Sequence, residues 1–195
     1  MSYQEEYRRS LDEPEAFWKE KAADLKWYKE PQQILSQDEH GIHHWFADGE
    51  MNTCYMAVDY HVESGRGDQA AIIYDSPVTE TKQTITYREL QDSVAKTAGM
   101  LQALGVTKGD RVIVYMPMVP EAAISMLACA RLGAIHSVVF GGFSSRELAT
   151  RIDDARPKLI VAGSCGIEPN RVVKYKPLLD QAIEMAAHKP ERCVL

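Results

Sequence analysis

From Gln69 to Leu195, short apolar segments alternate with longer segments whose apolar residues recur every three or four positions. The short segments have the length and the Val and Ile content of strands, and the longer ones have helical periodicity. Strands that alternate with helices in this way form a mostly parallel sheet with helices on both faces, so we predict an α/β fold. Its strands are expected at Ala70–Tyr74, Thr84–Tyr87, Arg111–Met116, Ala134–Phe140, Lys158–Ala162 and Arg192–Leu195.

The expected helices carry start and stop signals. Thr86-x-x-Glu89 is a capping box, and Gly105 ends the apolar stripe that follows it. Pro120 suits the first turn of the next helix, which Gly133 ends. Two further helices are predicted over Ser145–Ala155 and Lys174–His188.

The turn after Ala134–Phe140 is the most informative local feature. Gly141 and Gly142 follow the strand, and Ser144-x-x-Glu147 has the pattern of a helix start. Paired glycines allow unusual φ values and a close ligand approach, and a helix N-terminus attracts phosphate or carboxylate groups. Open α/β sheets bind ligands at such places. The spacing is not G-x-G-x-x-G, however, and a tight turn without a ligand explains these residues alone equally well.

The first 62 residues have a different character. Apolar residues in Tyr3–Leu25 fit one or two short helices interrupted at Pro14. Aromatic residues then occur among polar ones without periodicity, which predicts an irregular, aromatic-rich N-terminal extension packed on a larger body. We place this extension at 1–62 and the α/β domain at 63–195. The sequence stops within the apolar run at Val194–Leu195, which predicts a truncated part of a larger domain.

Composition narrows the functional class. The 195 residues are 45% hydrophobic, enough for one sizeable core, and their net charge of −6 is the wrong sign for nucleic acid binding. No apolar run approaches the roughly 18 residues of a membrane span, and the N-terminus does not fit a signal peptide. Four widely spaced cysteines favour free thiols over a disulfide or zinc framework. We expect a cytoplasmic protein that binds neither nucleic acid nor membrane.

Three other groups have better structural than functional explanations. His40-x-x-His43-His44 lacks partners at metal-binding spacing, so surface histidines are favoured. Ser64-Gly65-Arg66-Gly67 is the nearest approach to a phosphate loop, but it follows no apolar strand, so a solvated loop is favoured. His136 lies within a predicted strand and is interpreted as a hydrogen-bonded histidine of the sheet. We predict no metal site and no catalytic residue in this chain.

Five ordered segments are similar to one enzyme family. GAIHSVVFGGFS at 133–144 resembles the corresponding segment of AMP-forming short-chain acyl-CoA synthetases, the acetyl- and propionyl-CoA synthetase branch of the adenylate-forming enzymes. SCGIEP-x-R at Ser164–Arg171 is more similar to the propionyl than to the acetyl enzymes. The other four segments that resemble the family are Pro14–Trp18, Trp45–Val62, Thr86–Leu90 and Gly105–Met118.

The resemblance implies an acid–thiol ligase. ATP and propionate or acetate give an acyl-adenylate and pyrophosphate, and the CoA thiol then displaces AMP; Mg²⁺ accompanies the first step. In the family, the phosphate loop, the acyl pocket and the adenylation lysine lie downstream of the region matched here. The chain therefore corresponds to the first part of the large N-terminal domain, and we expect it to be inactive by itself.

The same resemblance assigns part of a CoA site. In the acetyl enzymes the Phe-Gly-Gly after this strand approaches CoA, which implies Phe140, Gly141 and Gly142 here. Two arginines in a DEG-x-R-x-x-R pattern hold the CoA 3′-phosphate; Arg171 aligns with the second and Glu168 with the first. Because a carboxylate repels a phosphate, either Glu168 turns away or the phosphate is held differently. A solvated arginine at the start of the next helix is the alternative for Arg171.

Two functions of other classes stay open at this point. The chain fits a free-standing α/β module that binds CoA or a nucleotide without catalysis, or a structural domain used in subunit contacts. A longer reading frame with a Ser/Thr/Gly-rich loop and a lysine favours the ligase. The sequence indicates no particular oligomeric state.

Overall fold

A computed structural model of the protein describes residues 2–195. The chain separates into two compact units, one that ends at Asn52 and one over Thr53–Leu195, called here the N-terminal and the C-terminal unit. Each is described by itself. The domain boundary at residue 62 stays a prediction.

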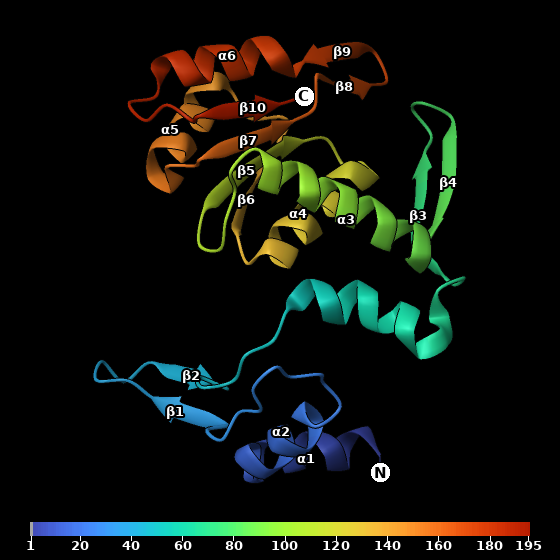
Figure 1. Ribbon diagram of the computed structural model, residues 1–195, viewed down its shortest axis with the longest axis vertical. Coiled ribbons are helices and arrows are strands. Elements are labelled where there is room, and N and C mark those ends of the chain that lie inside the picture. Colours follow the sequence, from blue (N-terminus) through green and yellow to red (C-terminus); the bar gives the residue numbers. More distant parts are fainter. Residues whose placement is uncertain (1) are drawn as a thin grey trace. The chain divides into compact units, whose positions relative to one another are not determined.

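A four-stranded parallel sheet forms the centre of the C-terminal unit (Figure 1). From β5 the chain moves to β6 on one side, and then crosses to β7 and β10 on the other side. This reversal makes the carboxyl end of β5 a topological switch point, where open α/β sheets bind ligands. In spatial order, the strands are β10 (Arg192–Val194), β7 (Leu159–Ala162), β5 (Arg111–Met116) and β6 (Ile135–Phe140).

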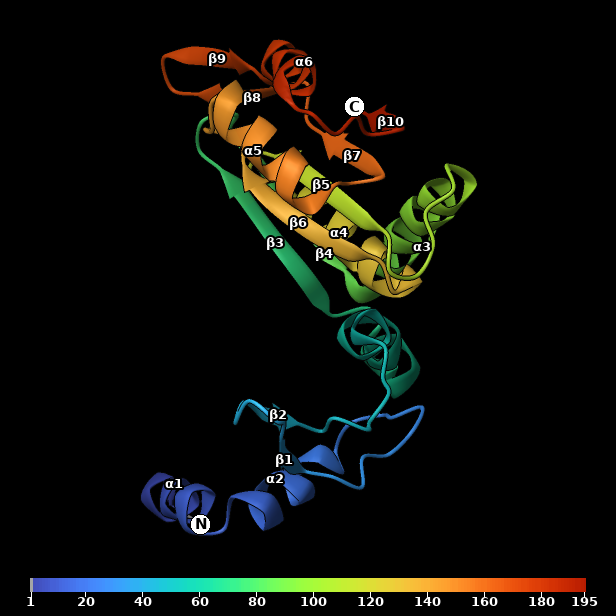
Figure 2. The ribbon, with the colours of Figure 1, turned by 90° about the vertical axis from the view of Figure 1, so that its left-hand side faces the viewer.

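Helices cover both faces of this sheet, and Figure 2 shows α5 in front of β5 and β6. Val112 and Val161 point into the core under α3 and α4, whereas Ile113 and Ile160 point into the core under α5 and α6. This alternation follows the two-residue period of a strand. The predicted α/β fold is therefore confirmed. The helices are α3 (Tyr87–Ala103), α4 (Pro120–Leu132), α5 (Ser145–Ala155) and α6 (Tyr175–Met185).

The local signals at helix ends are also confirmed. Thr86 and Glu89 cap α3 reciprocally, since each backbone N–H donates to the other's side chain. Pro120 is the first residue of α4, and Gly133 ends it with a φ of 69°, in the left-handed region that favours glycine. Among the residues that the structure describes, no helix is both long and apolar enough to span a lipid bilayer.

Outside the parallel sheet, β3 (Ala70–Ser76) and β4 (Thr81–Thr86) form an antiparallel hairpin. The sequence predicted both strands, but β3 extends to Ser76 where its end was expected at Tyr74, and β4 begins at Thr81 where its start was expected at Thr84. Their turn lies at residues 77–80, because pairing continues to Ser76 and Thr81.

The loop predicted at Ser64–Gly67 is wrong, although Ser64 and Gly65 are exposed to solvent as predicted. Most of residues 53–66 are helical and include two wide π-helical turns, η1 (Tyr55–Asp59) and η2 (Val62–Arg66). Gly65 interrupts η2 with a φ of 81°, and Gly67 after it is buried. The helix lacks a regular apolar stripe, but Cys54 and Val58 join the core beneath α3. Tertiary packing thus stabilises a helix that local periodicity did not reveal.

From the sequence we expected no strand between Ala162 and Lys174, and this expectation is wrong. Residues 165–174 form a second hairpin, β8 (Cys165–Glu168) and β9 (Arg171–Lys174), with Pro169 and Asn170 as its two-residue turn. Arg171 therefore lies on a strand and not at a helix start. Each strand has four residues, which is too short for a clear alternating pattern.

In the N-terminal unit, α1 (Tyr3–Asp12) and α2 (Pro14–Ala22) are separated at Pro14, as predicted. A short hairpin, β1 (Leu35–Gln37) and β2 (His43–Trp45), follows. The aromatic rings pack on one another: ring centroids are 5.9 Å apart for Trp18 and Trp45, and 5.6 Å apart for Trp27 and Phe46. These ring contacts order a segment that has little regular structure.

Candidate functional site

The turn that follows β6 is closed by a hydrogen bond from the Phe143 N–H to the Phe140 carbonyl, at 3.1 Å. Gly141 and Gly142 occupy its two central positions. The sequence suggested that they supply unusual φ values, but neither has a φ in the left-handed region. Close packing, and not backbone conformation, is what requires glycine here.

The two glycines face different neighbours. A Cβ atom on Gly141, which is buried, would lie 2.3 Å from the hydroxyl oxygen of Tyr175. A Cβ atom on Gly142, which is exposed, would lie 2.5 Å from Cε1 of the Phe140 ring. Packing against Tyr175 in the interior therefore excludes a side chain at Gly141. Gly142 is limited by the Phe140 side chain, which is itself 62% exposed and accessible to a ligand.

Tyr115 stabilises this turn from the interior of the protein, through hydrogen bonds to two of its carbonyl groups. It lies near the carboxyl end of β5, is fully buried, and its hydroxyl is 3.4 Å from the Gly141 carbonyl and 3.2 Å from the Phe143 carbonyl. Burial, with a smaller contribution from Tyr175, raises the pKa of Tyr115. The phenol therefore stays protonated at neutral pH and donates to these carbonyls.

The start of α5 is held by its own cap and by α6. The Ser144 hydroxyl accepts from the Glu147 N–H at 3.4 Å, whereas the Glu147 carboxylate pairs with Arg151 at 3.3 Å. Ser145, also buried, donates from its hydroxyl to Oε1 of Gln181 in α6 at 2.8 Å. The helix that follows the glycine turn is thus anchored at its first residue.

Arg171 and Glu168 pair with each other across the end of the β8–β9 hairpin. Nε of Arg171 lies 2.7 Å from Oε2 of Glu168, and the two side chains are 72% and 47% exposed. The hydrogen bond to Glu168 raises the pKa of Arg171. Glu168 therefore points toward Arg171. Whether Glu168 turns away from a bound phosphate, or the phosphate is held differently, stays a prediction. The pair carries no net charge, but the Arg171 guanidinium keeps its positive charge and remains accessible to solvent.

The glycine turn and the hairpin follow β6 and β7, the strands on either side of β5. Tyr175, the first residue of α6, contacts both segments: Cβ atoms on Gly141 and on Gly166 would each lie 2.3 Å from its hydroxyl. The structure thus brings the two predicted parts of the site to one edge of the sheet. Sequence reasoning missed Tyr115 and Tyr175, because an aromatic residue in an apolar strand or helix has the pattern of an ordinary core residue. It also missed Gly166, which lies in the β8–β9 hairpin that the sequence did not predict.

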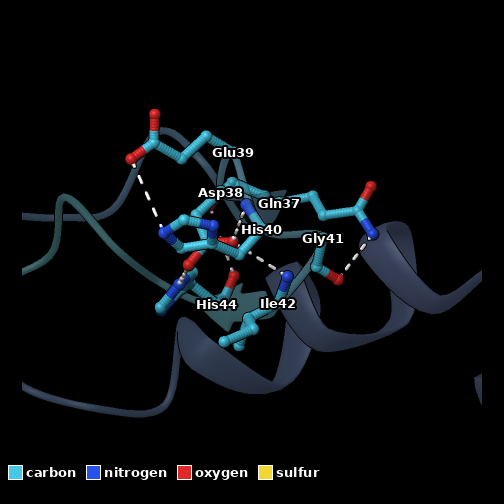
Figure 3. A network of polar contacts seen from close by, with 8 residues as sticks. Gln37, Asp38, Glu39, His40, Gly41, Ile42 and His44 are labelled. Carbon is cyan, nitrogen blue, oxygen red and sulfur yellow. Dashed lines mark hydrogen bonds and ion pairs between the residues drawn. The ribbon is translucent and has the colours of Figure 1, made fainter.

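Of the histidines at residues 40–44, His40 lies in the turn of the β1–β2 hairpin, and His43 and His44 begin β2 (Figure 3). Asp38 accepts hydrogen bonds from the backbone N–H groups of His40 and Ile42, both at 2.9 Å, and pairs with the His44 ring at 3.1 Å. Within residues 2–195, no group of three or more His, Cys, Asp or Glu side chains could hold a metal ion. These histidines are exposed, as predicted.

The cysteines are free thiols, as the sequence predicted. Cys54 and Cys129 are buried in the core beneath α3 and α4, where burial raises the pKa of Cys129 to about 11. His136 is half-buried on β6, consistent with its interpretation as a residue of the sheet.

Residues 60–194 match the family described as AMP-binding enzymes, and residues 3–57 match the N-terminus of acetyl-coenzyme A synthetase. An uncharacterized protein of Pseudomonas aeruginosa is 59% identical, over 97% of this chain and 30% of its own length. The mitochondrial acyl-CoA synthetase short-chain family member 3 of Bos taurus is 50% identical, over 99% of this chain and 28% of its own length. The propionate–CoA ligase of Escherichia coli K12 is 47% identical, over 100% of this chain and 31% of its own length.

The chain spans about three tenths of the length of the curated relatives it matches. The match covers both the N-terminal unit and the parallel sheet with its glycine turn. This chain therefore belongs to the family of AMP-binding enzymes, with short-chain acyl-CoA synthetases among its relatives.

Proposed function

We propose that this chain is part of an acid–thiol ligase that joins a short-chain carboxylate to CoA. ATP and the carboxylate give an acyl-adenylate and pyrophosphate; the CoA thiol then attacks the acyl carbon, and AMP leaves. The observation that carries the proposal is the similarity to a short-chain acyl-CoA synthetase and to a propionate–CoA ligase over nearly every residue of the chain.

Within this reaction, we assign the residues at the carboxyl edge of the sheet to CoA. Phe140 offers an exposed apolar face, and Gly142 keeps the backbone beside it free of a side chain. Arg171 supplies a cation for a phosphate group and is accessible to solvent. Glu168 competes with that phosphate for the guanidinium, because the side chains of Glu168 and Arg171 pair with each other.

The ATP site is assigned to no residue of this chain. In the family that the sequence resembles, the phosphate loop and the adenylation lysine lie downstream of the region matched here. For this reason the chain alone should give no exchange of pyrophosphate into ATP with propionate or acetate. Exchange above background in a preparation free of contaminating ligase would show that the adenylation site lies within residues 1–195.

Propionate is the substrate we favour over acetate. The support for propionate is the similarity of Ser164–Arg171 to the propionyl enzymes and the name of one relative, a propionate–CoA ligase.

We also retain a cytoplasmic location as a proposal, although one relative is named as mitochondrial. Fractionation of cells that express a tagged intact protein tests the location.

The test of function uses the intact protein encoded by the gene that contains this sequence. With ATP, Mg²⁺, CoA and carboxylate, it should form AMP and acyl-CoA in equal amounts, with a higher kcat/KM for propionate than for acetate. Omission of CoA should leave only pyrophosphate exchange. Binding of CoA without AMP formation from any short carboxylate would instead identify a non-catalytic CoA-binding module.

A further inference from the structure

The ring of Tyr175 is enclosed by backbone from two separate segments. A Cβ atom on Gly141, in the turn after β6, would lie 2.3 Å from its hydroxyl oxygen, and so would a Cβ atom on Gly166 in β8. A Cβ atom on Gly163, after β7, would lie 3.8 Å from Cδ2 of the same ring. A side chain at Gly141 or Gly166 would displace the ring, since real Cβ atoms do not approach other atoms within 3 Å.

Tyr175 is also fixed from the interior. Its backbone N–H donates to the Ser164 carbonyl at 3.0 Å, and its side chain is 7% exposed. The ring centroid lies 5.1 Å from that of Tyr115, whose hydroxyl reaches the carbonyls of Gly141 and Phe143. One tyrosine therefore holds the glycine turn by hydrogen bonds, and the other separates that turn from the hairpin.

We infer that Tyr175 is a positioning residue for CoA: its ring sets the spacing between the Phe140–Gly142 turn and the hairpin that carries Arg171. The inference rests on the proposed function, because it needs a ligand that contacts both segments. Phe140 and Arg171 are both largely exposed, so few neighbours fix them directly. Their separation depends on the backbone segments that carry them, and a ligand held at two points needs that separation to be constant.

A purely structural role for Tyr175 makes a different prediction. Leu179 lies one turn later in α6, is 1% exposed, and belongs to the same core as Tyr175. Leu179 is not among the atoms nearest to a Cβ atom built at Gly141, Gly163 or Gly166. Loss of either side chain should lower stability, but only loss of Tyr175 should change the affinity for CoA.

The experiment compares Tyr175→Ala, Tyr175→Phe and Leu179→Ala in the intact protein. Tyr175→Ala should raise the KM for CoA about tenfold or more, with pyrophosphate exchange changed by less than about twofold. Tyr175→Phe keeps the ring and should restore most of the affinity. Leu179→Ala should lower the melting temperature as Tyr175→Ala does and leave the KM for CoA unchanged. An equal rise in KM for Leu179→Ala would reduce Tyr175 to a core residue.

Gly166→Ala provides a second test that keeps the Tyr175 ring. The new methyl group should push the ring toward Gly141 and raise the KM for CoA, and it should add little in the Tyr175→Ala background. Full additivity would overturn the inference even where Tyr175→Ala folds poorly. An unchanged KM for Tyr175→Ala in an active ligase overturns the inference alone. A wild-type protein that ligates no carboxylate to CoA overturns the proposed function and the inference together.

Discussion

Nε of Arg171 donates a hydrogen bond to Oε2 of Glu168 at 2.7 Å, across the two-residue turn of the β8–β9 hairpin. The two residues are directly opposite in the strand register, which holds their side chains on one face of the hairpin. The carboxylate that should repel a phosphate is therefore the partner of the arginine proposed to bind it. A phosphate group must compete with Glu168, and this competition can be measured.

Glu168→Gln should strengthen CoA binding, because it removes the competing charge and keeps the side-chain shape. Exposed ion pairs are weak, so the KM for CoA should fall by no more than about fivefold. The matched control is Asp180→Asn, which breaks an exposed pair with Lys176 on α6 and should leave this KM unchanged. Steady-state kinetics of the intact protein measure both. A rise in KM for Glu168→Gln would mean that the pair orients Arg171 for CoA and does not compete with it.

Arg171→Ala should raise the KM for CoA and leave the adenylation half-reaction nearly unchanged, since the 3′-phosphate is remote from the reacting carbonyl. Loss of one charge-assisted contact typically weakens apparent affinity by about ten- to a hundredfold. Dephospho-CoA lacks the phosphate and should respond little to the substitution. Kinetics with the two forms of CoA check this. An equal loss for both forms would remove the phosphate assignment and favour a solvated arginine at this position.

Gly142→Leu should block thioester formation with CoA and with dephospho-CoA alike, because a bulky side chain beside Phe140 obstructs the approach of either form. The substitution should not unfold the protein: the nearest obstacle is the ring of Phe140, which is exposed and has room to turn into solvent. Single-turnover formation of acyl-CoA, beside pyrophosphate exchange, separates the two steps. Thioester formation at the wild-type rate would exclude Gly142 from the CoA path.

Local signals in the sequence were sufficient for most of the fold. Thr86, Glu89, Pro120 and Gly133 mark helix ends by side-chain and backbone chemistry that acts within one turn, so their roles are readable without the tertiary structure. β5 was predicted at its observed bounds, because a buried parallel strand has a continuous apolar run.

The candidate site was only partly predictable, because its contacts join residues far apart in the chain. The sequence identified the glycine turn but gave the wrong reason for Gly141, whose requirement arises from Tyr175 in another element. The β8–β9 hairpin was missed because its short strands have little pattern of their own. Whether Phe140, Gly142 and Arg171 bind CoA stays a prediction.

The turn of the β1–β2 hairpin should depend on pH through Asp38. Hydrogen bonds from the His44 ring, from the Ile42 N–H and from the His40 N–H lower the pKa of Asp38 from its ordinary value of 3.8. Its stabilisation of the turn is therefore fully present above pH 3.8 and is lost as the pH falls through the lowered value in the folded protein. NMR titration of the Ile42 amide should show a midpoint below 3.8, and Asp38→Asn should abolish the titration. A midpoint above 3.8 would contradict the contacts drawn in Figure 3.

The ion pair between Asp59 and Arg131 should contribute more to stability than any exposed pair of this chain. Oδ2 of Asp59 lies 2.6 Å from Nη2 of Arg131 in α4, and its Oδ1 accepts from Nε2 of Gln91 in α3 at 2.9 Å. The two charged side chains are only 15% and 28% exposed. The Asp59 carboxylate thus links the π-helical segment to α3 and α4.

Asp59→Asn keeps the shape of this side chain and removes the charge that compensates Arg131. Breaking a buried pair costs about 3–5 kcal/mol, and partial exposure reduces this, so we expect the free energy of unfolding to fall by about 2 kcal/mol. Urea unfolding of the chain, followed by circular dichroism, measures the change. Asp92→Asn, which breaks an exposed pair with Lys96 on α3, is the control and should change little. The double substitution Asp59→Leu with Arg131→Met should recover part of the loss, because apolar side chains of similar size need no compensating charge. Equal stability of Asp59→Asn and the wild type would show that the charge of Asp59 contributes little to holding the π-helical segment, which also packs through Cys54 and Val58.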